Sequence, residues 1–339
     1  MCRVAQETVM EWILWALNEG FFMGLMKIGQ VVVGRQSPTL WHVILATGIT
    51  GGVMMIAGFF IVIAKKRSVS VPGGYLAGSV ASGLAMFGAT FCAFAALRDG
   101  ADMGANTFIG NALIIIPTAF IGRWNFHERI GIRQWMGVAL GLAGAVFVTV
   151  PALGKGGGYA WISWSLGTLF FATLMRVLPK WLAKWGASQG LPPLHPGQML
   201  FWGGAIMTLC MLLGFAGGAD IRRDVLAPVL LAVIIGVALC NVVWWWSRLR
   251  AFQAHAPIAL KDLPSLPVYL GTASIAGTIF FGDAMSVVKV AGLLMFFPAF
   301  FLAEERAWEQ CARFFARYPL RHYATAHWRK RHLVQYMGR

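Results

Sequence analysis

Fifteen residues near the start of the chain recur near its middle, at a fixed offset of 149 positions. The two segments read ILWALNEGFFMGLMK, residues 13–27, and ISWSLGTLFFATLMR, residues 162–176. Seven of the fifteen positions are identical, and a basic residue closes each segment, Lys27 in the first and Arg176 in the second. Compositional bias between two apolar segments accounts for about two or three matches, so seven in register predict a duplicated chain.

The composition places this duplicated chain in a membrane. Of its 339 residues, 58% are hydrophobic and 12% are charged, and the mean hydropathy is +0.67. A soluble domain carries about twice that charged fraction. The 40 glycines and 14 prolines suit membrane helices, in which small residues let backbones approach closely. We therefore expect an all-α polytopic membrane protein.

Apolar runs of about 20 residues, the length that spans a bilayer, predict ten transmembrane helices. They lie near residues 10–33, 39–64, 71–97, 101–123, 131–151, 159–178, 196–217, 226–250, 257–281 and 285–302. With the N-terminus inside, twelve basic residues of the N-terminus and short loops, Arg176 and Arg248 among them, lie on the cytoplasmic side and five on the other. This follows the positive-inside rule, so the net charge of +15 reflects topology rather than nucleic-acid binding. We expect a multi-pass protein of the inner (plasma) membrane with both termini in the cytoplasm.

The duplication extends beyond the first span. At an offset of 155 residues further positions align: Ala96 with Ala251, Ala101 with Ala256, Asn106 with Lys261, Thr107 with Asp262, Glu128 with Asp283 and Gly137 with Gly292. We predict a first five-helix repeat over residues 1–152, a second over 153–303 and a basic cytoplasmic tail over 304–339. Because five is an odd number, the second repeat is inverted in the membrane, which is typical of secondary transporters with a substrate site near the midplane. This topology places Lys27 toward the outer face and Arg176 toward the inner face.

The tail differs in character from the spans. It carries eight basic and three acidic residues, with Arg313, Arg317 and Arg321 spaced four apart. We interpret it as an amphipathic segment that lies on anionic inner-leaflet lipids. A regulatory or partner-docking segment is the alternative, and we expect no nucleic acid as a partner.

The order of several residues resembles the drug/metabolite transporter superfamily, specifically its EamA-like ten-helix branch. Repeats of that family show an A-L-x(3)-A stretch, a proline midway along the next span, an acidic residue at the following turn and then a Gly-rich span. The first half reproduces this order with Ala96-Leu97, Ala101, Pro117, Glu128 and Gly137-x(3)-Gly141. The second half keeps Ala251, Ala256, Asp283 and Gly292, with Thr272 in place of the proline. The resemblance covers roughly residues 10–303 and implies two inverted five-helix repeats that move a small solute by alternating access.

The first span is also similar to the first helix of the small multidrug resistance proteins, which are distant members of the same superfamily. There a membrane glutamate precedes a Leu/Met-Lys pair at the interval that separates Glu19 from Leu25-Met26-Lys27 here. The residue before the glutamate is alanine in that family and Asn18 in this chain. In that family the glutamate binds protons and the cationic substrate in turn, so the resemblance implies proton coupling at Glu19.

Glu19 is also the strongest candidate on physical grounds. A carboxylate about a third of the way into the bilayer is costly unless it is paired, protonated or facing a water-filled cavity. Lys27 lies about 12 Å farther along the same helix and is too distant to be its partner. Two interpretations stay open: Glu19 is a proton-coupling or substrate-binding carboxylate, or it forms a structural ion pair with Lys261 or Lys289.

Lys261 and Asp262 are adjacent at the cytoplasmic start of the ninth span. Helix neighbours point about 100° apart, so each is expected to have a partner of its own rather than the other. They are interpreted either as interfacial side chains that snorkel to the membrane edge or as a gate or substrate contact, with Asn106 opposite them in the repeat register. Pro257, Pro264 and Pro267 are expected to break this helix.

Other polar and aromatic residues complete the predicted site. Asn111 and Asn241 are amides within spans that either form hydrogen bonds between helices or line a cavity. Trp244-Trp245-Trp246 is predicted mainly as an interfacial belt with one ring in the cavity, and Glu128 and Asp283 as turn or helix-start residues. The five cysteines and the histidines lack metal-ligand spacing, so neither a metal nor a cofactor is expected.

These patterns favour a secondary transporter of a small metabolite or drug-like solute, with proton-coupled export through Glu19 as the first hypothesis. A carrier for uptake of a sugar or other neutral metabolite, in which Glu19 is structural, is the alternative within transport. A non-transporting membrane scaffold that acts through its basic tail is the alternative outside it. The sequence holds no Walker A motif and no nucleophile–base set, so we expect neither ATP coupling nor an enzyme. Substrate and oligomeric state, including a homodimer, stay open.

Overall fold

The computed structural model describes residues 2–101, 103–149, 159–217, 228–254, 256–258, 260–281 and 285–303, with the side chains described from residue 11 onward except at 104, 105, 149 and 303. Three regions interpreted above lie outside this part of the chain: the tail over 304–339, the predicted boundary between the repeats over 151–158, and Asp283.

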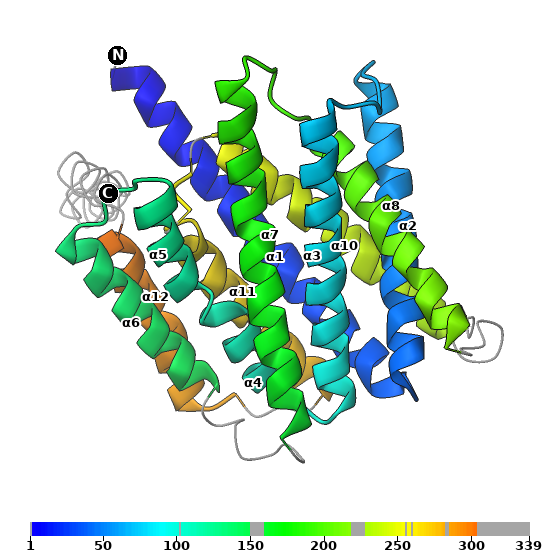
Figure 1. Ribbon diagram of the computed structural model, residues 1–339. Helices are drawn as coiled ribbons and strands as arrows, with labels where there is room; N and C mark the ends of the chain where they lie inside the picture. Colours follow the sequence, from blue (N-terminus) through cyan, green and yellow to red (C-terminus); the bar gives the residue numbers. More distant parts are fainter. Residues whose placement is uncertain are drawn as a thin grey trace, which may run out of the picture.

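All regular elements in the described residues are helices (Figure 1). They are α1 (Cys2–Gln36), α2 (Leu40–Ala64), α3 (Gly73–Arg98), α4 (Met103–Thr107), η1 (Phe108–Ala112), α5 (Ile115–Asn125), α6 (Ile132–Thr149), α7 (Ala160–Ser188), α8 (Pro196–Ala216), α10 (Pro228–Gln253), α11 (Asp262–Phe281) and α12 (Val287–Ala303). Six of them, α2, α3, α7, α8, α10 and α11, are long and apolar enough to cross a membrane. The expected all-helical class is confirmed, and the six long apolar helices are consistent with the expected membrane location.

The predicted fourth span, residues 101–123, is broken into three pieces rather than continuous. The five-residue α4 leads into the π-helical turn η1, and α5 begins again at Ile115. Pro117 explains the break, because it has no N–H to bond to the Leu113 carbonyl and its ring crowds that oxygen. Asn111 lies within the π-helical turn, and such turns are frequent at functional sites.

The ninth span starts later than predicted. It was expected from residue 257, but α11 begins at Asp262, and Lys261 lies in the turn before it. Pro264 is compatible with this start because the first helical turn needs no N–H from it. The expected break at Pro267 is wrong, since the helix continues through that residue to Phe281.

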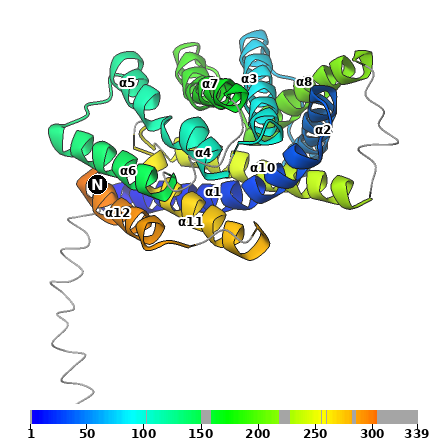
Figure 2. The same cartoon turned by 90° about the horizontal axis from the view of Figure 1, so that it is seen from below.

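The helices pack in pairs drawn from the two halves of the chain. α1 packs against α10 and α11, and α3 packs against α7. The pair α2 and α8 and the pair α6 and α12 flank this centre on opposite sides, as the view from below shows (Figure 2). α1 and α7 run in opposite directions: α1 begins at the upper edge, and α7 begins at the lower edge and ends at the upper one (Figure 1).

Two glycines bring α1 into close contact with α11. A Cβ added at Gly20 would lie 2.2 Å from the backbone oxygen of Ser265, and one at Gly24 would lie 2.5 Å from Cβ of Thr272. Only a residue without a side chain permits this approach. The contact holds the start of α11, and Lys261 just before it, beside the segment of α1 that carries Glu19.

Candidate functional site

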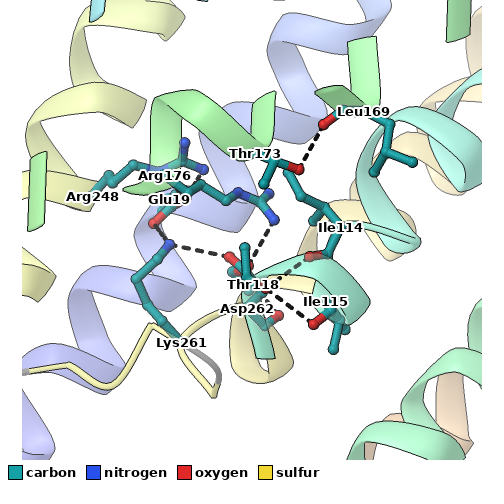
Figure 3. Close-up of polar contacts among 11 residues, drawn as sticks. Glu19, Ile114, Ile115, Thr118, Leu169, Thr173, Arg176, Arg248, Lys261 and Asp262 are labelled. Atoms are coloured by element: carbon teal, nitrogen blue, oxygen red, sulfur yellow. Dashed lines mark hydrogen bonds and ion pairs between the residues drawn. The ribbon is translucent and has the colours of Figure 1, made fainter. Parts of the chain in front are cut away.

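Glu19 is fully buried between α1, α10 and the turn before α11. Its Oε1 accepts hydrogen bonds from Nη2 and Nε of Arg248, at 2.6 and 2.9 Å. Its Oε2 accepts a third from Nζ of Lys261 at 2.6 Å (Figure 3). Glu19 and both cations are at most 1% exposed. The ion pair with Lys261, one of the interpretations considered for Glu19, is therefore present, and Arg248 is an additional partner.

Asp262 is the second buried carboxylate of this cluster. Its Oδ2 accepts a hydrogen bond from Nη1 of Arg176 at 2.7 Å. Nζ of Lys261 lies 3.2 Å from its Oδ1, although Oδ1 receives no hydrogen bond of good geometry. Glu19, Asp262, Arg176, Arg248 and Lys261 thus form one connected charge cluster in which three cations surround two carboxylates (Figure 3).

The geometry corrects two expectations about Lys261 and Asp262. They do not snorkel to the membrane edge, because they are 0% and 1% exposed and face other buried charges. They also contact each other, although each has a separate main partner as expected. The two side chains do not point apart as helix neighbours would, because Lys261 lies in the turn before α11 rather than within the helix.

Arg176 and Arg248 are the functional candidates that sequence reasoning missed. Both were assigned to cytoplasmic loops, but they lie inside α7 and α10 and are 3% and 0% exposed. One signal pointed to Arg176: it matches Lys27 in the fifteen-residue recurrence. For Arg248 the sequence offered only its place near the end of a predicted span, and α10 in fact continues to Gln253.

Lys27 is buried without a carboxylate beside it. It is 1% exposed, and its Nζ donates a hydrogen bond to Oδ1 of Asn106, whose Nδ2 in turn donates to Oγ of Ser165 at 3.4 Å. No carboxylate in the described part of the chain forms an ion pair with it. Its counterpart in the recurrence, Arg176, has Asp262 as its partner. The two copies therefore hold equivalent cations, and only the second has a compensating charge.

These side chains surround a central cavity of about 40 Å³, which is room for only about two or three water molecules. Three cations and several neutral polar groups line it: Lys27, Arg176, Arg248, Gln30, Thr90, Asn111, Thr168, Asn241 and Tyr269. The rest of the lining is apolar and rich in thioethers: Met23, Met26, Met86, Met175, Ala89, Ala93, Ala172 and Trp244. Lys27 and Arg176, expected toward opposite faces of the membrane, face this one cavity. Glu19 and Asp262 stand behind it, each bonded to an arginine of the lining.

The predicted amides take different positions. Asn111 lines the cavity and donates to the Tyr269 hydroxyl at 3.3 Å, so it combines both of its predicted roles. Asn241 lines the cavity, and its Oδ1 has no hydrogen-bond partner among the described residues. Asn106 lies behind the lining and holds Lys27. Asn18 is outside the cavity and donates to Oγ of Ser247 at 2.6 Å, which fastens α1 to α10.

The tryptophan triplet is only in part an interfacial belt. Trp244 and Trp245 are 4% and 0% exposed, so only Trp246, which is partly exposed, fits the belt. Trp244 supplies the one ring expected in the cavity. Cζ of Arg248 lies 4.2 Å from the centroid of this ring, close enough for a cation–π interaction. The stack orients the guanidinium group at the cavity wall.

A larger basic vestibule of about 710 Å³ lies one helical turn away, at the end of the bundle where α2, α7 and α10 finish. Its charged and titratable lining consists of Lys65, Arg67, Lys180, His195 and Arg250. Burial, together with Arg67, Arg250 and Lys65, lowers the pKa of His195. At this end Glu128 pairs with Lys180 and accepts a hydrogen bond from the backbone N–H of Ile258 at 3.0 Å, which fixes the chain that leads into α11.

The described residues contain no group of three or more His, Cys, Asp or Glu side chains placed to hold a metal ion. The fold is similar to that of a solved structure described as "Crystal structure of protein", with a TM-score of 0.65, 15% sequence identity, and coverage of 87% of this chain and 98% of that one. Neither a protein-family model nor a curated protein sequence matches the chain. The likeness concerns the fold alone.

Proposed function

We propose that this protein is a secondary transporter of the drug/metabolite superfamily, EamA-like in architecture, that moves a small solute across the cytoplasmic membrane by alternating access. The observation that carries this proposal is the central cavity: a polar, cation-lined hollow inside a bundle of apolar helices. Buried charge is costly in a membrane helix and usually marks a substrate or ion pathway. α1, α3 and η1 contribute to the cavity from the first half of the chain, and α7, α10 and α11 contribute from the second.

The helix pairings support a ten-span architecture of two inverted repeats. In the predicted repeats α1 corresponds to α7, α3 to α10, and the span of α4, η1 and α5 to α11. The pair α1 with α10 therefore corresponds to the pair α7 with α3, and both pairs are observed. The pair α1 with α11 becomes α7 with η1, which also pack together. The pairs α2 with α8 and α6 with α12 map onto themselves. The opposite directions of α1 and α7 are those that an inverted duplication requires.

The small size of the cavity is consistent with an occluded state. A metabolite needs more space than about 40 Å³, so access requires the helices around the cavity to separate. The basic vestibule is the natural route on one side, and its positive charge favours the cytoplasmic side for that end of the bundle. The start of α1 and the end of α12 would then both face the cytoplasm (Figure 1).

Proton-coupled export through Glu19 remains part of the proposal. Because both carboxylate oxygens of Glu19 are occupied by cation donors, a proton that binds there must displace Arg248 or Lys261. Loss of either contact would loosen the connection of α1 with α10 or α11. Protonation would thereby be linked to the helix separation that opens the cavity. In the alternative uptake carrier these contacts are purely structural.

Transport can be tested without knowledge of the substrate. Proteoliposomes with the full chain are loaded with a cell metabolite extract, placed in a pH gradient, and analysed by mass spectrometry for solutes that leave faster than from protein-free vesicles. We expect at least one small solute to leave in a gradient-dependent way. Glu19→Gln should abolish the gradient dependence, and Glu11→Gln, an exposed glutamate on the same helix, should not.

Two outcomes would change the conclusion. Gradient-driven efflux that persists in folded Glu19→Gln protein would exclude Glu19 as the coupling residue. If the wild-type protein moved no solute in either direction, the scaffold alternative would replace transport.

A further inference from the structure

We propose that the central cavity binds the anionic head group of a small organic acid, a carboxylate or phosphate, and that Lys27, Arg176 and Arg248 are its ligands. This inference rests on the proposed function, because it names the class of solute that the transporter would carry. It is narrower than the sequence hypotheses, which named a small metabolite or drug-like solute, or a sugar or other neutral metabolite, and no anionic head group.

The buried charged side chains around the cavity carry an excess of positive charge. The buried charged side chains of the described residues are four cations, Lys27, Arg176, Arg248 and Lys261, and two carboxylates, Glu19 and Asp262. An unpaired buried charge in a low-dielectric environment is strongly unfavourable. Lys27 can relieve its own excess by losing its proton, but a guanidinium group cannot. Even with neutral Lys27, Arg176, Arg248 and the ion-paired Lys261 face two carboxylates, so an anion in the cavity would compensate the excess positive charge.

Three of the buried cations, and neither of the carboxylates, face the cavity. The three cations of the lining are Lys27, Arg176 and Arg248, whereas both carboxylates stand behind the cavity wall. A solute in the cavity would therefore meet the cations directly. Nε of Arg176 and Nη1 of Arg248 are buried and have no hydrogen-bond partner in the described structure. Each arginine thus uses part of its guanidinium group to hold a carboxylate and leaves a donor for a second acceptor.

The uncharged part of the cavity lining indicates what the rest of the solute would be. The remaining lining combines methionine, alanine and one tryptophan ring with a few hydroxyl and amide groups. Methionine side chains adapt to irregular apolar shapes, so this part of the cavity suits an apolar body of variable outline. A hydrated inorganic ion would make few favourable contacts with these apolar side chains. The combination favours an organic acid over inorganic phosphate.

The vestibule provides a route for such a solute. Arg176 of the cavity and Lys180 of the vestibule are one turn apart on α7, about 6 Å along the helix. Lys65, Arg67 and Arg250 add further positive charge to the vestibule. A cleft lined by charge of one sign raises the local concentration of ions of the opposite sign. Anions would therefore be drawn toward the end of the bundle that leads to the cavity.

The test uses four probes with the same four-carbon skeleton and different heads: butyrate, monobutyl phosphate, butyramide and butylammonium. Each is titrated at constant ionic strength against the purified full-length protein, and binding is followed by the rise in thermal unfolding midpoint. We expect saturable stabilisation by butyrate or monobutyl phosphate, and the comparison of these two identifies the preferred head. Butyramide and butylammonium should bind at least about tenfold more weakly.

Lys27→Gln is the decisive variant because Lys27 holds no carboxylate, so its replacement leaves no acidic side chain unpaired. We expect it to fold and to bind the preferred anion at least about tenfold more weakly. Lys289→Gln is the matched control, since this lysine lies on α12 and does not line the cavity. Its affinity for the anion should equal that of the wild type.

Three results would overturn the inference: preference for butyramide or butylammonium, unchanged anion affinity in folded Lys27→Gln protein, or binding of none of the four probes. None of these results would by itself refute transport, because solute efflux from proteoliposomes is measured separately. Conversely, anion binding without any efflux would leave the binding site in place and refute the transporter.

Discussion

Arg248 contacts Glu19 at 2.6 Å while its guanidinium group also lines the central cavity. One residue therefore connects the carboxylate that sequence reasoning singled out with the hollow that a solute would occupy. Any change in the charge of Glu19 alters how firmly Arg248 is held. This relationship makes the buried cluster, rather than Glu19 alone, the unit on which mutations should act.

The first prediction concerns the stability contributed by Glu19. Glu19→Gln leaves Arg248 and Lys261 buried beside a neutral side chain, and removal of one member of a buried ion pair typically costs about 3–5 kcal/mol. We expect a loss of this size in the free energy of unfolding, measured by reversible denaturation in mixed micelles. Glu11→Gln, on the exposed face of the same helix, should change stability by less than about 0.5 kcal/mol. Equal effects of the two variants would contradict the buried network.

The second prediction concerns the pair formed by Arg176 and Asp262. Arg176→Gln and Asp262→Asn should each destabilise the protein, because each leaves an uncompensated charge. The double variant removes both charges and should be more stable than the sum of the single effects by about 1 kcal/mol or more. A double-mutant cycle of unfolding free energies measures this coupling. Strict additivity would show that the 2.7 Å contact contributes nothing to folding.

The third prediction concerns the close approach of α1 and α11. Gly20→Ala places a methyl group against the backbone oxygen of Ser265 and should cost about 1–3 kcal/mol, because backbone has to move. Gly271→Ala on α11 is the control, since a Cβ there meets no atom within 4 Å. It should be neutral or stabilising by up to about 1 kcal/mol, the helix propensity gained. Thermal unfolding of both variants measures the two changes in stability. Similar losses of stability in the two variants would contradict tight packing at Gly20.

The fourth prediction concerns pH and His195, which caps the start of α8. Its Nδ1 accepts a hydrogen bond from the backbone N–H of Gly197 at 3.1 Å, so the ring must be unprotonated at that nitrogen. Its pKa is lowered by burial and by neighbouring cations, so below its ordinary value of about 6.5 the unfolded chain takes up a proton that the folded state resists. Stability should therefore be constant above that pH and fall as the pH drops below it.

His195→Asn tests this prediction because asparagine keeps a capping oxygen and does not titrate. The unfolding midpoint of the variant should depend less on pH between pH 7 and pH 5 than that of the wild type. Identical pH profiles for the two proteins would show that His195 does not contribute to acid sensitivity.

The long apolar helices were predictable because hydropathy over a window of about 20 residues depends on local composition. The spans predicted at 39–64 and 196–217 correspond to α2 (Leu40–Ala64) and α8 (Pro196–Ala216). The broken fourth span was missed because the break arises from Pro117, which was matched only to the family's proline midway along the span. Apolar composition does not distinguish a continuous helix from an interrupted one.

The site was predictable only in part, for a related reason. Glu19 and Lys261 stood out because a charge within an apolar run is conspicuous in any sequence. Arg176 and Arg248 lie near the ends of predicted spans, where basic residues are ordinary. The positive-inside count therefore assigned both to cytoplasmic loops. The contact of Glu19 with Arg248 joins residues 229 positions apart, and only the tertiary packing of α1 on α10 reveals it.

The central claim, that a solute passes through the cavity by alternating access, is tested most directly by labelling from each side of the membrane. A cysteine-free variant receives Thr90→Cys at the cavity wall or, as a control, Thr118→Cys, which is buried and does not line the cavity. Each is exposed in oriented vesicles to a membrane-impermeant thiol reagent, first from one side and then from the other. Alternating access predicts that Cys at position 90 is labelled from both sides and Cys at position 118 from neither. Labelling of position 90 from one side only, or from neither, would contradict it.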